Sequence, residues 1–427
     1  MMPRANAVPP DVTRRRFLTS AAGGLVAASG AARASVPQGA QATGAPDAPP
    51  RAFDRKVKVG LVGCGGRGSK IAKLMMEFGG YELVAVADYF QGRADTTGDA
   101  HGVPDGKRFS GLSGFRRVME SGAEAVVLET PPYFFPEHAA AAVEAGLHVY
   151  MAKPVAVDVP GAIRIGELGR ASSSKSRVFF VDYQIPTDPH NIEVARRIRD
   201  GALGKMQMVL SSGFKKGNPG FKDKPVGETI EDRLTDLVWV NDDAMGGGYT
   251  VNYDIHAIDG VIWALGKRPV AAEGCGGRFR QGAHGDSLDT SFVTLRFDDG
   301  VLWNHTSITH RLNDWGPEDS LAAEFLGEEA AARISYWGKA YVRGGAMHFP
   351  GGEIVGLYDS GIRRNLAEFY DKVVAGDFGN GTAQRSVDCT LASILVREVA
   401  RRGTPMTIDA LIRENRRLEV NLKGLRA

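Results

Sequence analysis

The stretch VKVGLVGCGGRG, from Val57 to Gly68, decides how the first half of the chain folds. Its opening residues have the length and valine content of a buried β-strand, and the strand runs into a loop with the spacing GxGxxG. Apolar residues then recur at helical spacing as far as Gly79, and a second strand, YELVAVAD, ends at Asp88. The strand, glycine loop, helix, strand and terminal acid together form the context that the GxGxxG motif needs.

This arrangement predicts a dinucleotide-binding site. Glycines let the backbone approach a pyrophosphate, whose negative charge is stabilised by free N–H groups at the start of a helix. Asp88 can accept hydrogen bonds from the adenosine ribose and would repel a 2′-phosphate, which favours NAD over NADP, although Arg93 nearby leaves NADP open. A glycine turn without a ligand is the alternative. The predicted cofactor contacts of this unit are Gly63, Gly65, Gly66, Arg67, Gly68 and Asp88.

Strands and helices continue to alternate after Asp88. Apolar strands are expected at 123–130 and 148–153, with a helix between them that ends at Gly146. Alternation of this kind predicts a parallel, doubly wound sheet whose ligands lie over the carboxyl ends of its strands. Lys153 then lies at the cofactor cleft, and Pro154 biases it toward an extended conformation. We expect this NAD(P)-binding Rossmann domain at 56–185.

The second half of the chain has a different pattern. A helix is expected at 190–204, a β-hairpin about Asp299-Gly300, and further strand material at 331–345. His256 and Asp259 fall three apart in a helical pattern, so they share a helix face. Without a third ligand this pair does not predict a metal site. We expect an α/β substrate and oligomerisation domain at 186–355, and helices at 356–427 that pack back near the first domain.

Composition excludes several classes of function. The chain has 427 residues, 43% of them hydrophobic, which is ample for two domains. Its formal charge of +2 points to neither nucleic acid nor a membrane surface as a partner. Three cysteines without a CxxC pair make a zinc site or a disulfide scaffold a poor expectation.

The N-terminal residues have the pattern of a targeting segment. TRRRFLTS (13–20) precedes a short, weakly apolar run and the small-x-small triplet Ala32-Arg33-Ala34. The order resembles a twin-arginine signal, which implies export to the periplasm after folding. A basic tail without that role is the alternative. We therefore expect a signal peptide at 1–34 and a flexible linker at 35–55, which is rich in Ala, Pro and Gly.

Four motifs occur in an order that resembles one family. They are the glycine loop, Thr130-Pro131-Pro132 with His138 after it, Lys153-Pro154, and GGGYTVNYDIHAID (246–259). This chain is similar to the glucose–fructose oxidoreductase / inositol dehydrogenase (Gfo/Idh/MocA) family. The resemblance implies a Rossmann domain followed by an α+β domain with a large open, mainly antiparallel sheet. Such a sheet commonly forms oligomer contacts, so a homodimer or homotetramer is expected.

The resemblance also implies roles for individual residues. Lys153 and His256 correspond to a lysine and a histidine that act on the substrate hydroxyl. Further cofactor contacts implied in the first domain are Thr130, Pro131, His138 and Lys153. The substrate side is expected to include Tyr183, Asn252 and Asp259, with ordinary packing as the alternative for Tyr183.

Two positions depart from the family pattern. The usual glutamate before the lysine is Ala152, and the usual aspartate four residues before the histidine is Asn252. An amide can orient an imidazole but cannot stabilise its cation as a carboxylate does. Either a neighbouring acid compensates, or the proton-transfer pair differs. We expect His256 to act as the base and Lys153 to polarise the oxygen, with the reverse left open.

The predicted function is therefore NAD-dependent hydride transfer between a sugar or cyclitol hydroxyl and a tightly bound cofactor. Tight binding is expected because an exported enzyme would carry its nucleotide with it. A redox-neutral, NAD-dependent glycosidase is the alternative, and a non-catalytic sugar-binding relative is a second one.

Overall fold

The structure is a computed structural model that describes residues 52–215, 229–235, 238–280, 285–309 and 320–427. The predicted signal peptide at 1–34 and nearly all of the predicted linker at 35–55 lie outside the described residues. The first strand begins at Val57, next to the expected start at Lys56.

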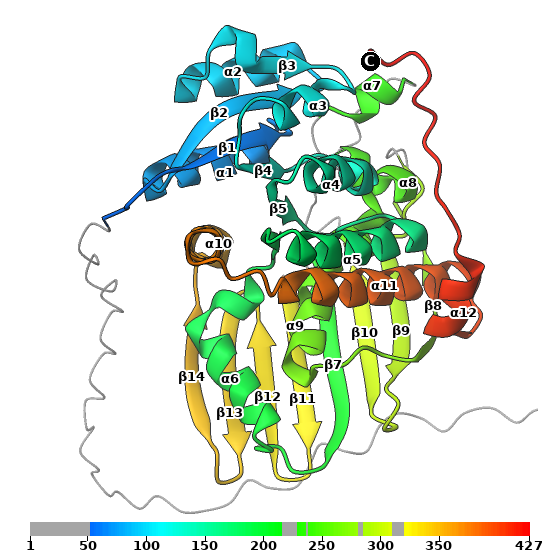
Figure 1. Cartoon of the computed structure of the whole chain (residues 1–427). Coiled ribbons are helices and arrows are strands. Elements are labelled where there is room, and N and C mark those ends of the chain that lie inside the picture. Colours follow the sequence, from blue (N-terminus) through cyan, green and yellow to red (C-terminus); the bar gives the residue numbers. More distant parts are fainter. Residues whose placement is uncertain (1–51, 216–228, 236–237, 281–284, 310–319) are drawn as a thin grey trace, which may run out of the picture. The chain divides into compact units, whose positions relative to one another are not determined.

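Six strands form a parallel sheet in the first half of the chain (Figure 1). Their order is β3-β2-β1-β4-β5-β6, and all neighbouring pairs run parallel. The direction of winding reverses between β1 and β4, which is the point where doubly wound sheets bind ligands. The strands are β1 Val57–Val62, β2 Tyr81–Asp88, β3 Arg108–Ser110, β4 Ala125–Leu128, β5 His148–Ala152 and β6 Phe179–Asp182.

Helices cover both faces of this sheet. Successive strand residues point to opposite faces, so β4 sends Ala125 and Val127 into one apolar cluster and Val126 and Leu128 into another. The first cluster is closed by α1, α2 and α10, and the second by α3, α4 and α5. These helices are α1 Gly66–Phe78, α2 Gln91–His101, α3 Gly114–Met119, α4 Phe135–Glu144, α5 Val159–Ser174 and α10 Leu357–Ala375.

Nine strands form a second sheet, in the order β14-β13-β12-β11-β7-β10-β9-β8-β15. β7 and β10 run parallel, and every other neighbouring pair described runs antiparallel. The predicted hairpin is confirmed by β9 and β10, whose turn contains Gly300 with a φ of +86°. The strands are β7 Met206–Phe214, β8 Ala271–Gly277, β9 Thr290–Arg296, β10 Leu302–Ile308, β11 Ser320–Gly327, β12 Ala330–Ser335, β13 Gly338–Gly344, β14 Phe349–Ile354 and β15 Met406–Thr407.

One face of the second sheet is covered by helices, and α6, α9 and α11 lie in front of it in Figure 1. α9 is almost wholly buried because it lies between the sheet and α11. The opposite face carries exposed apolar side chains, among them Met208, Leu210, Phe292 and Leu302. The predicted fold class, a Rossmann domain followed by a mainly antiparallel sheet, is confirmed. The remaining helices are α6 Pro189–Arg199, α7 Ile230–Arg233, α8 Asp243–Gly246, α9 Ile255–Leu265, α11 Gly381–Arg402 and α12 Ile408–Glu414.

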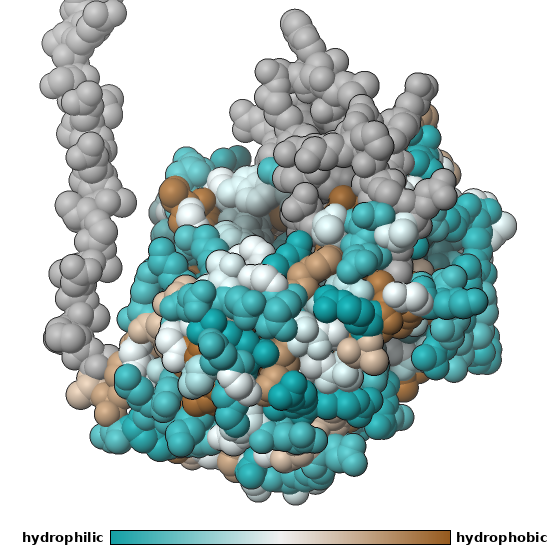
Figure 2. All heavy atoms as spheres, turned by 90° about the horizontal axis from the view of Figure 1, so that it is seen from above, coloured by the Kyte–Doolittle hydropathy of each residue, from teal (hydrophilic) through white to brown (hydrophobic). Residues whose placement is uncertain are grey.

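The surface of the Rossmann side is mostly hydrophilic. Outside the part that grey atoms cover, Figure 2 shows apolar residues only in small groups among polar ones, as is usual for a protein surface in water. Within the described ranges, no helix combines the length and the apolar character that a bilayer span needs.

Candidate active site

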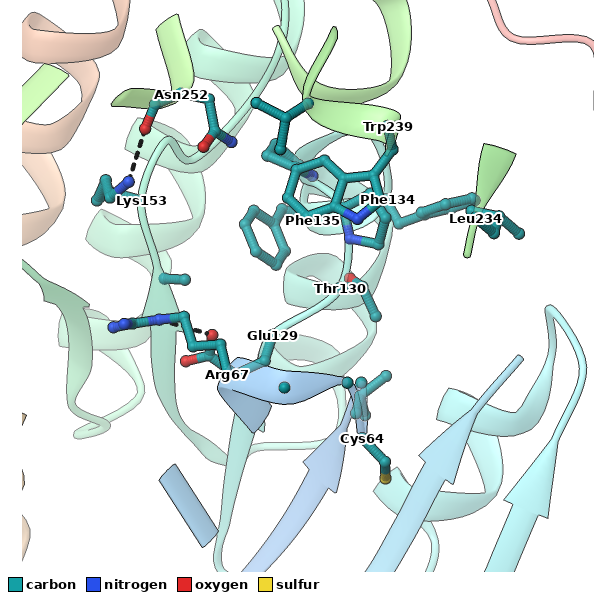
Figure 3. Close-up of a pocket in the computed structure, with 18 of the residues that line it drawn as sticks. Cys64, Arg67, Glu129, Thr130, Phe134, Phe135, Lys153, Leu234, Trp239 and Asn252 are labelled. Atoms are coloured by element: carbon teal, nitrogen blue, oxygen red, sulfur yellow. Dashed lines mark hydrogen bonds and ion pairs between the residues drawn. The ribbon is translucent and has the colours of Figure 1, made fainter. Parts of the chain in front are cut away.

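A large cavity opens over the carboxyl ends of the parallel strands and continues toward the second sheet. Its volume is about 1240 Å³. Ordinary small-molecule sites measure roughly 300–1,000 Å³, so a dinucleotide and a second small molecule fit together. Residues of both predicted halves of the site meet here, with Cys64 and Arg67 on one side and Asn252 on the other (Figure 3).

The glycine loop has the shape that a pyrophosphate requires. Gly63 has a φ of +97°, and a Cβ on it would lie 2.7 Å from the Glu129 backbone. A Cβ on Gly68 would lie 1.8 Å from the Gly63 carbonyl oxygen, so these two glycines are needed for close packing. Gly65 and Gly66 instead face open space, and α1 begins there without a side-chain cap. The first N–H groups of the helix are therefore accessible, and the residues fit a dinucleotide.

Asp88 ends β2 at the rim of the same cavity. Its two carboxylate oxygens accept hydrogen bonds from the Cys64 and Phe90 backbone N–H groups, at 2.8 and 3.0 Å. Burial raises the pKa of Asp88, and the two N–H donors act against that rise. The carboxyl group is thus held in place at the position where a ribose diol would be recognised. Arg93 lines the cavity as well, with its guanidinium over the Phe90 ring.

Thr130, Pro131 and His138 all line the cavity beyond β4. The Thr130 hydroxyl lies 3.2 Å from His138 Nδ1, and the imidazole is stacked with Phe134. Burial, with a smaller effect of the Arg116 charge, lowers the pKa of His138 to about 3. His138 is therefore a neutral ring that orients the Thr130 hydroxyl.

Lys153 follows β5 and reaches across the cavity to the second half of the chain. Its ammonium group donates to the Asn252 carbonyl oxygen at 2.6 Å (Figure 3), and its bond to Pro154 is cis. Burial and the Arg67 charge lower the pKa of Lys153 to about 7, against the raising effect of Asp182 and Glu129. A lysine with such a pKa can exchange a proton near neutral pH.

Arg67, which was predicted as a cofactor contact, forms ion pairs with two buried acids. Its guanidinium turns inward and lies 3.1 Å from Glu129 (Figure 3). It also pairs with Asp182 at the end of β6. Burial raises the pKa of Glu129 to about 7, although the Arg67 charge acts to lower it. Neither acid was among the predicted site residues. Both acids could have been predicted from the sequence, because each lies at the carboxyl end of a strand and the carboxyl ends of parallel strands meet at one edge of a sheet.

His256 lies at the start of α9, after a π-helical turn at Thr250–Asp254. Its ring contacts Tyr336 edge-on with a centroid distance of 4.8 Å, and its Nδ1 has no hydrogen-bond partner among the described residues. Burial, followed by the charges of Lys153 and Arg67, holds the pKa of His256 well below its ordinary value. His256 is therefore a neutral imidazole in the cavity.

The acids that flank His256 do not replace the missing aspartate. Asp254 faces the second sheet, where its carboxylate lies 3.4 Å from His305 Nε2. Asp259 pairs with Arg385 at 2.9 Å and lies 3.6 Å from Cys389 Sγ. The Asn252 side chain bonds the Gly246 carbonyl oxygen at 3.5 Å, not the imidazole. His256 thus has no carboxylate partner among the described residues.

Two of the predicted substrate contacts lie away from the cavity. Asp259 and Tyr183 are buried and belong to the contacts around Arg385, whose guanidinium lies over the Tyr183 ring. Neither lines the cavity. The helical pattern placed Asp259 on the face of His256, but it could not show that this part of the helix packs against α11. Asn252 does line the cavity.

The end of the cavity near the second sheet is rich in aromatic side chains, none of which was predicted from the sequence. Its lining includes Tyr249, Tyr253, Tyr336, Trp337 and Tyr358, with Lys215 beside them. Amphipathic rings of this kind suit a ligand with both apolar and polar faces. Among the described residues, no three His, Cys, Asp or Glu side chains come together as a metal site would need.

Comparison with known proteins gives a consistent result along the chain. Residues 57–183 match the model of GFO_IDH_MocA, an oxidoreductase family with an NAD-binding Rossmann fold. Residues 192–333 match the GFO/IDH/MocA C-terminal domain. The two matches together cover more than half of the chain.

Individual relatives are more distant. Inositol 2-dehydrogenase 4 of Saccharopolyspora erythraea is 28% identical over 258 residues, which are 58% of this chain and 66% of that protein. The 2,7-anhydro-N-acetylneuraminate hydratase of Mediterraneibacter gnavus is 26% identical over 57% of this chain and 59% of its own length. The matches thus span less than two thirds of these two relatives. The aldose–aldose oxidoreductase of Caulobacter crescentus has the same fold, with a TM-score of 0.64 and 20% identity over 83% of this chain and 100% of that chain.

Proposed function

Because the chain belongs to the GFO/IDH/MocA family of NAD-binding oxidoreductases, we propose that it transfers a hydride between a sugar or cyclitol hydroxyl and a tightly bound NAD. This proposal rests on the position of Lys153. Its amine lies in one cavity with the glycine loop and His256. When bound there, the nicotinamide would supply the hydride acceptor. The chain itself must then take the hydroxyl proton and steady the developing alkoxide.

The pKa values favour Lys153 as the proton acceptor, which reverses the roles expected from sequence. The pKa of Lys153 is lowered to about 7, so a large fraction of the amine is neutral at neutral pH. The pKa of His256 lies well below its ordinary value, so its imidazole is a weak base. We assign proton transfer to Lys153 and hydrogen bonding of the substrate oxygen to His256.

We further propose that the cofactor is NAD and not NADP, on the basis of Asp88. Asp88→Ser should weaken NAD binding about 10- to 100-fold, because hydrogen bonds from the ribose to a charged acceptor are lost. NADP binding should weaken less or improve, because the repelling charge is removed. Titration of both nucleotides into the same preparation measures the ratio, and Asp88→Asn serves as the variant that changes charge at nearly constant volume. An unchanged ratio in both variants contradicts the assignment.

The sugar or cyclitol class is proposed from the relatives and from the aromatic lining. One relative is named an inositol 2-dehydrogenase, and a cyclitol shares with sugars a ring that has apolar faces and a polar edge. Tyr336 and Trp337 can stack on such a face while Lys153 meets a hydroxyl at the edge. The test is a screen of sugars and cyclitols against the purified protein without added cofactor, with the absorbance of NADH as the readout. A substrate should generate the NADH signal from bound NAD.

Export and oligomerisation are part of the proposal. The twin-arginine pattern at 13–20 supports transport of the folded, cofactor-loaded protein to the periplasm. The exposed apolar side chains on the open face of the second sheet, including Phe292 and Leu302, support contacts between copies. Fractionation of cells and the mass of the protein in solution test these two points.

A redox-neutral reaction is the second candidate. One relative is named a hydratase, so addition of water has a precedent among similar chains. Transient oxidation would acidify a neighbouring C–H bond, a glycosidic group would leave, water would add, and the hydride would return. Borohydride reduction of the bound NAD should abolish such turnover, whereas a glycosidase independent of NAD would be unaffected. Sugar binding without any reaction would instead indicate a non-catalytic relative.

A further inference from the structure

The last part of the chain, Leu418–Arg426, runs from α12 back to the nucleotide-binding domain (Figure 1). Val420 and Leu422 turn toward the protein, whereas Glu419 and Asn421 are exposed. This alternation is typical of an extended segment laid on an apolar surface. The Leu418 N–H donates to the Asp158 carboxylate at 2.9 Å and fixes the start of the segment.

The apolar side chains of this segment support one wall of the cofactor cavity. Val420 belongs to a buried cluster with Phe134 and Leu234, and Leu422 and Leu425 pack against that cluster. Phe134 and Leu234 also line the cavity. The segment is therefore an outer layer of the wall, with one layer of side chains between it and the ligand space.

Arg426 joins the two loops that lie beyond Asp88. Its backbone N–H donates to the Tyr89 hydroxyl at 3.3 Å, and its guanidinium donates to the Tyr89 carbonyl oxygen at 3.1 Å and lies over the Tyr89 ring. Its own carbonyl oxygen accepts from the Leu112 N–H at 3.0 Å. Tyr89 follows β2, Leu112 follows β3, and both line the cavity. One residue thus bonds two loops that line the cavity.

We propose that Leu418–Arg426 is a strap that positions the adenosine end of the cofactor site and slows the release of NAD. Release past Asp88 requires the loops that carry Tyr89 and Leu112 to separate, and the strap bonds both. This proposal rests on the NAD-binding character of the family. It does not depend on which substrate is used or on the direction of the reaction. The strap acts on the cofactor site indirectly, through the lining residues that it positions.

The test is the rate of cofactor release from full-length protein. Protein loaded with NADH is mixed with excess NAD, and the decay of bound-NADH fluorescence is followed. Arg426→Ala should accelerate release about tenfold, because it removes a hydrogen bond and a cation–π contact from Tyr89. The double variant Leu422→Ser, Leu425→Ser should accelerate release at least as much. Arg417→Ala is the control, because Arg417 is exposed, immediately precedes the strap and pairs with Glu419 inside it.

A second measurement separates positioning from general loss of structure. In cofactor-free protein, amide exchange at Phe90 and Leu112 should become faster in Arg426→Ala and stay unchanged in Arg417→Ala. Arg426 is exposed, so this variant decides the matter even where the leucine variants fail to fold. Release and exchange at the wild-type rates in Arg426→Ala overturn the proposal. So does faster release without faster exchange at the two loops.

Discussion

Replacing Lys153 with methionine should lower turnover by about 10²–10⁴-fold, the range that loss of a positioned proton acceptor produces. Methionine keeps most of the length of the side chain but cannot accept the hydroxyl proton. NAD binding should change little, because the glycine loop and Asp88 retain their contacts. Turnover and NADH affinity are to be measured on the same preparation with a substrate from the sugar screen.

Lys215→Met is the matched control for this prediction. Both lysines line the cavity, so the two variants remove the same kind of group from the same space. They differ in position, because it is Lys153 that bonds the Asn252 carbonyl oxygen. We expect a much smaller loss of turnover in the control. Normal turnover in Lys153→Met would remove the central assignment of the proposed function.

The pH dependence of the same reaction identifies the base. The pKa of Lys153 is lowered to about 7, so the neutral amine becomes the dominant form as the pH rises above that value. Oxidation by the wild-type protein should therefore increase through pH ~7 and level off on the alkaline side. The increase should be absent from the residual activity of Lys153→Met. If it persists there, another group, such as His256, is the base.

The nucleotide-binding half could be predicted from sequence because its signals are local. The strand, the GxGxxG loop, the helix that ends at Gly79 and the acid at Asp88 lie within one stretch of chain, and the structure has each of them there. Lys153 could be placed at the cavity for the same reason, since a residue that follows a parallel strand lies at its carboxyl end.

The contacts of the second half could not be predicted in this way because they join distant segments. Asp259 and His256 share a helical pattern, but α9 packs against the sheet on one side and α11 on another, so only one of the two faces the cavity. The aromatic lining comes from several separate elements, and no spacing in the sequence joins them. The strap was also missed, although the alternation LEVNL at 418–422 is visible in the sequence.

Arg67 shows how a correctly located residue can have an additional role. It was predicted from the glycine loop as a cofactor contact, and it does line the cavity. Its guanidinium also compensates Glu129 and Asp182, whose side chains are 1% and 0% exposed. The residue before Lys153 is Ala152 and carries no charge, and these two acids act to raise the pKa of Lys153 against the lowering effect of burial and of Arg67.

Arg67→Met should therefore lower the free energy of unfolding by about 3–5 kcal/mol, the cost of leaving buried charges without a partner. The measurement is denaturant unfolding of cofactor-free protein at pH 8. Arg363→Met is the control, because the Arg363 pair with Glu77 is exposed and should contribute less than about 1 kcal/mol. Combining Arg67→Met with Glu129→Gln and Asp182→Asn should recover most of the loss, since no uncompensated charge then remains.

The loss should depend on pH in a defined direction. Burial already raises the pKa of Glu129 to about 7, above its value in the unfolded chain, and removal of Arg67 raises it further. The folded variant then binds more protons than the unfolded chain, so its stability falls as the pH rises through this range. The deficit relative to wild type should be largest at pH 8 and smaller at pH 5. A pH-independent deficit, or one below about 1 kcal/mol at pH 8, would show that Arg67 does not compensate buried carboxylates.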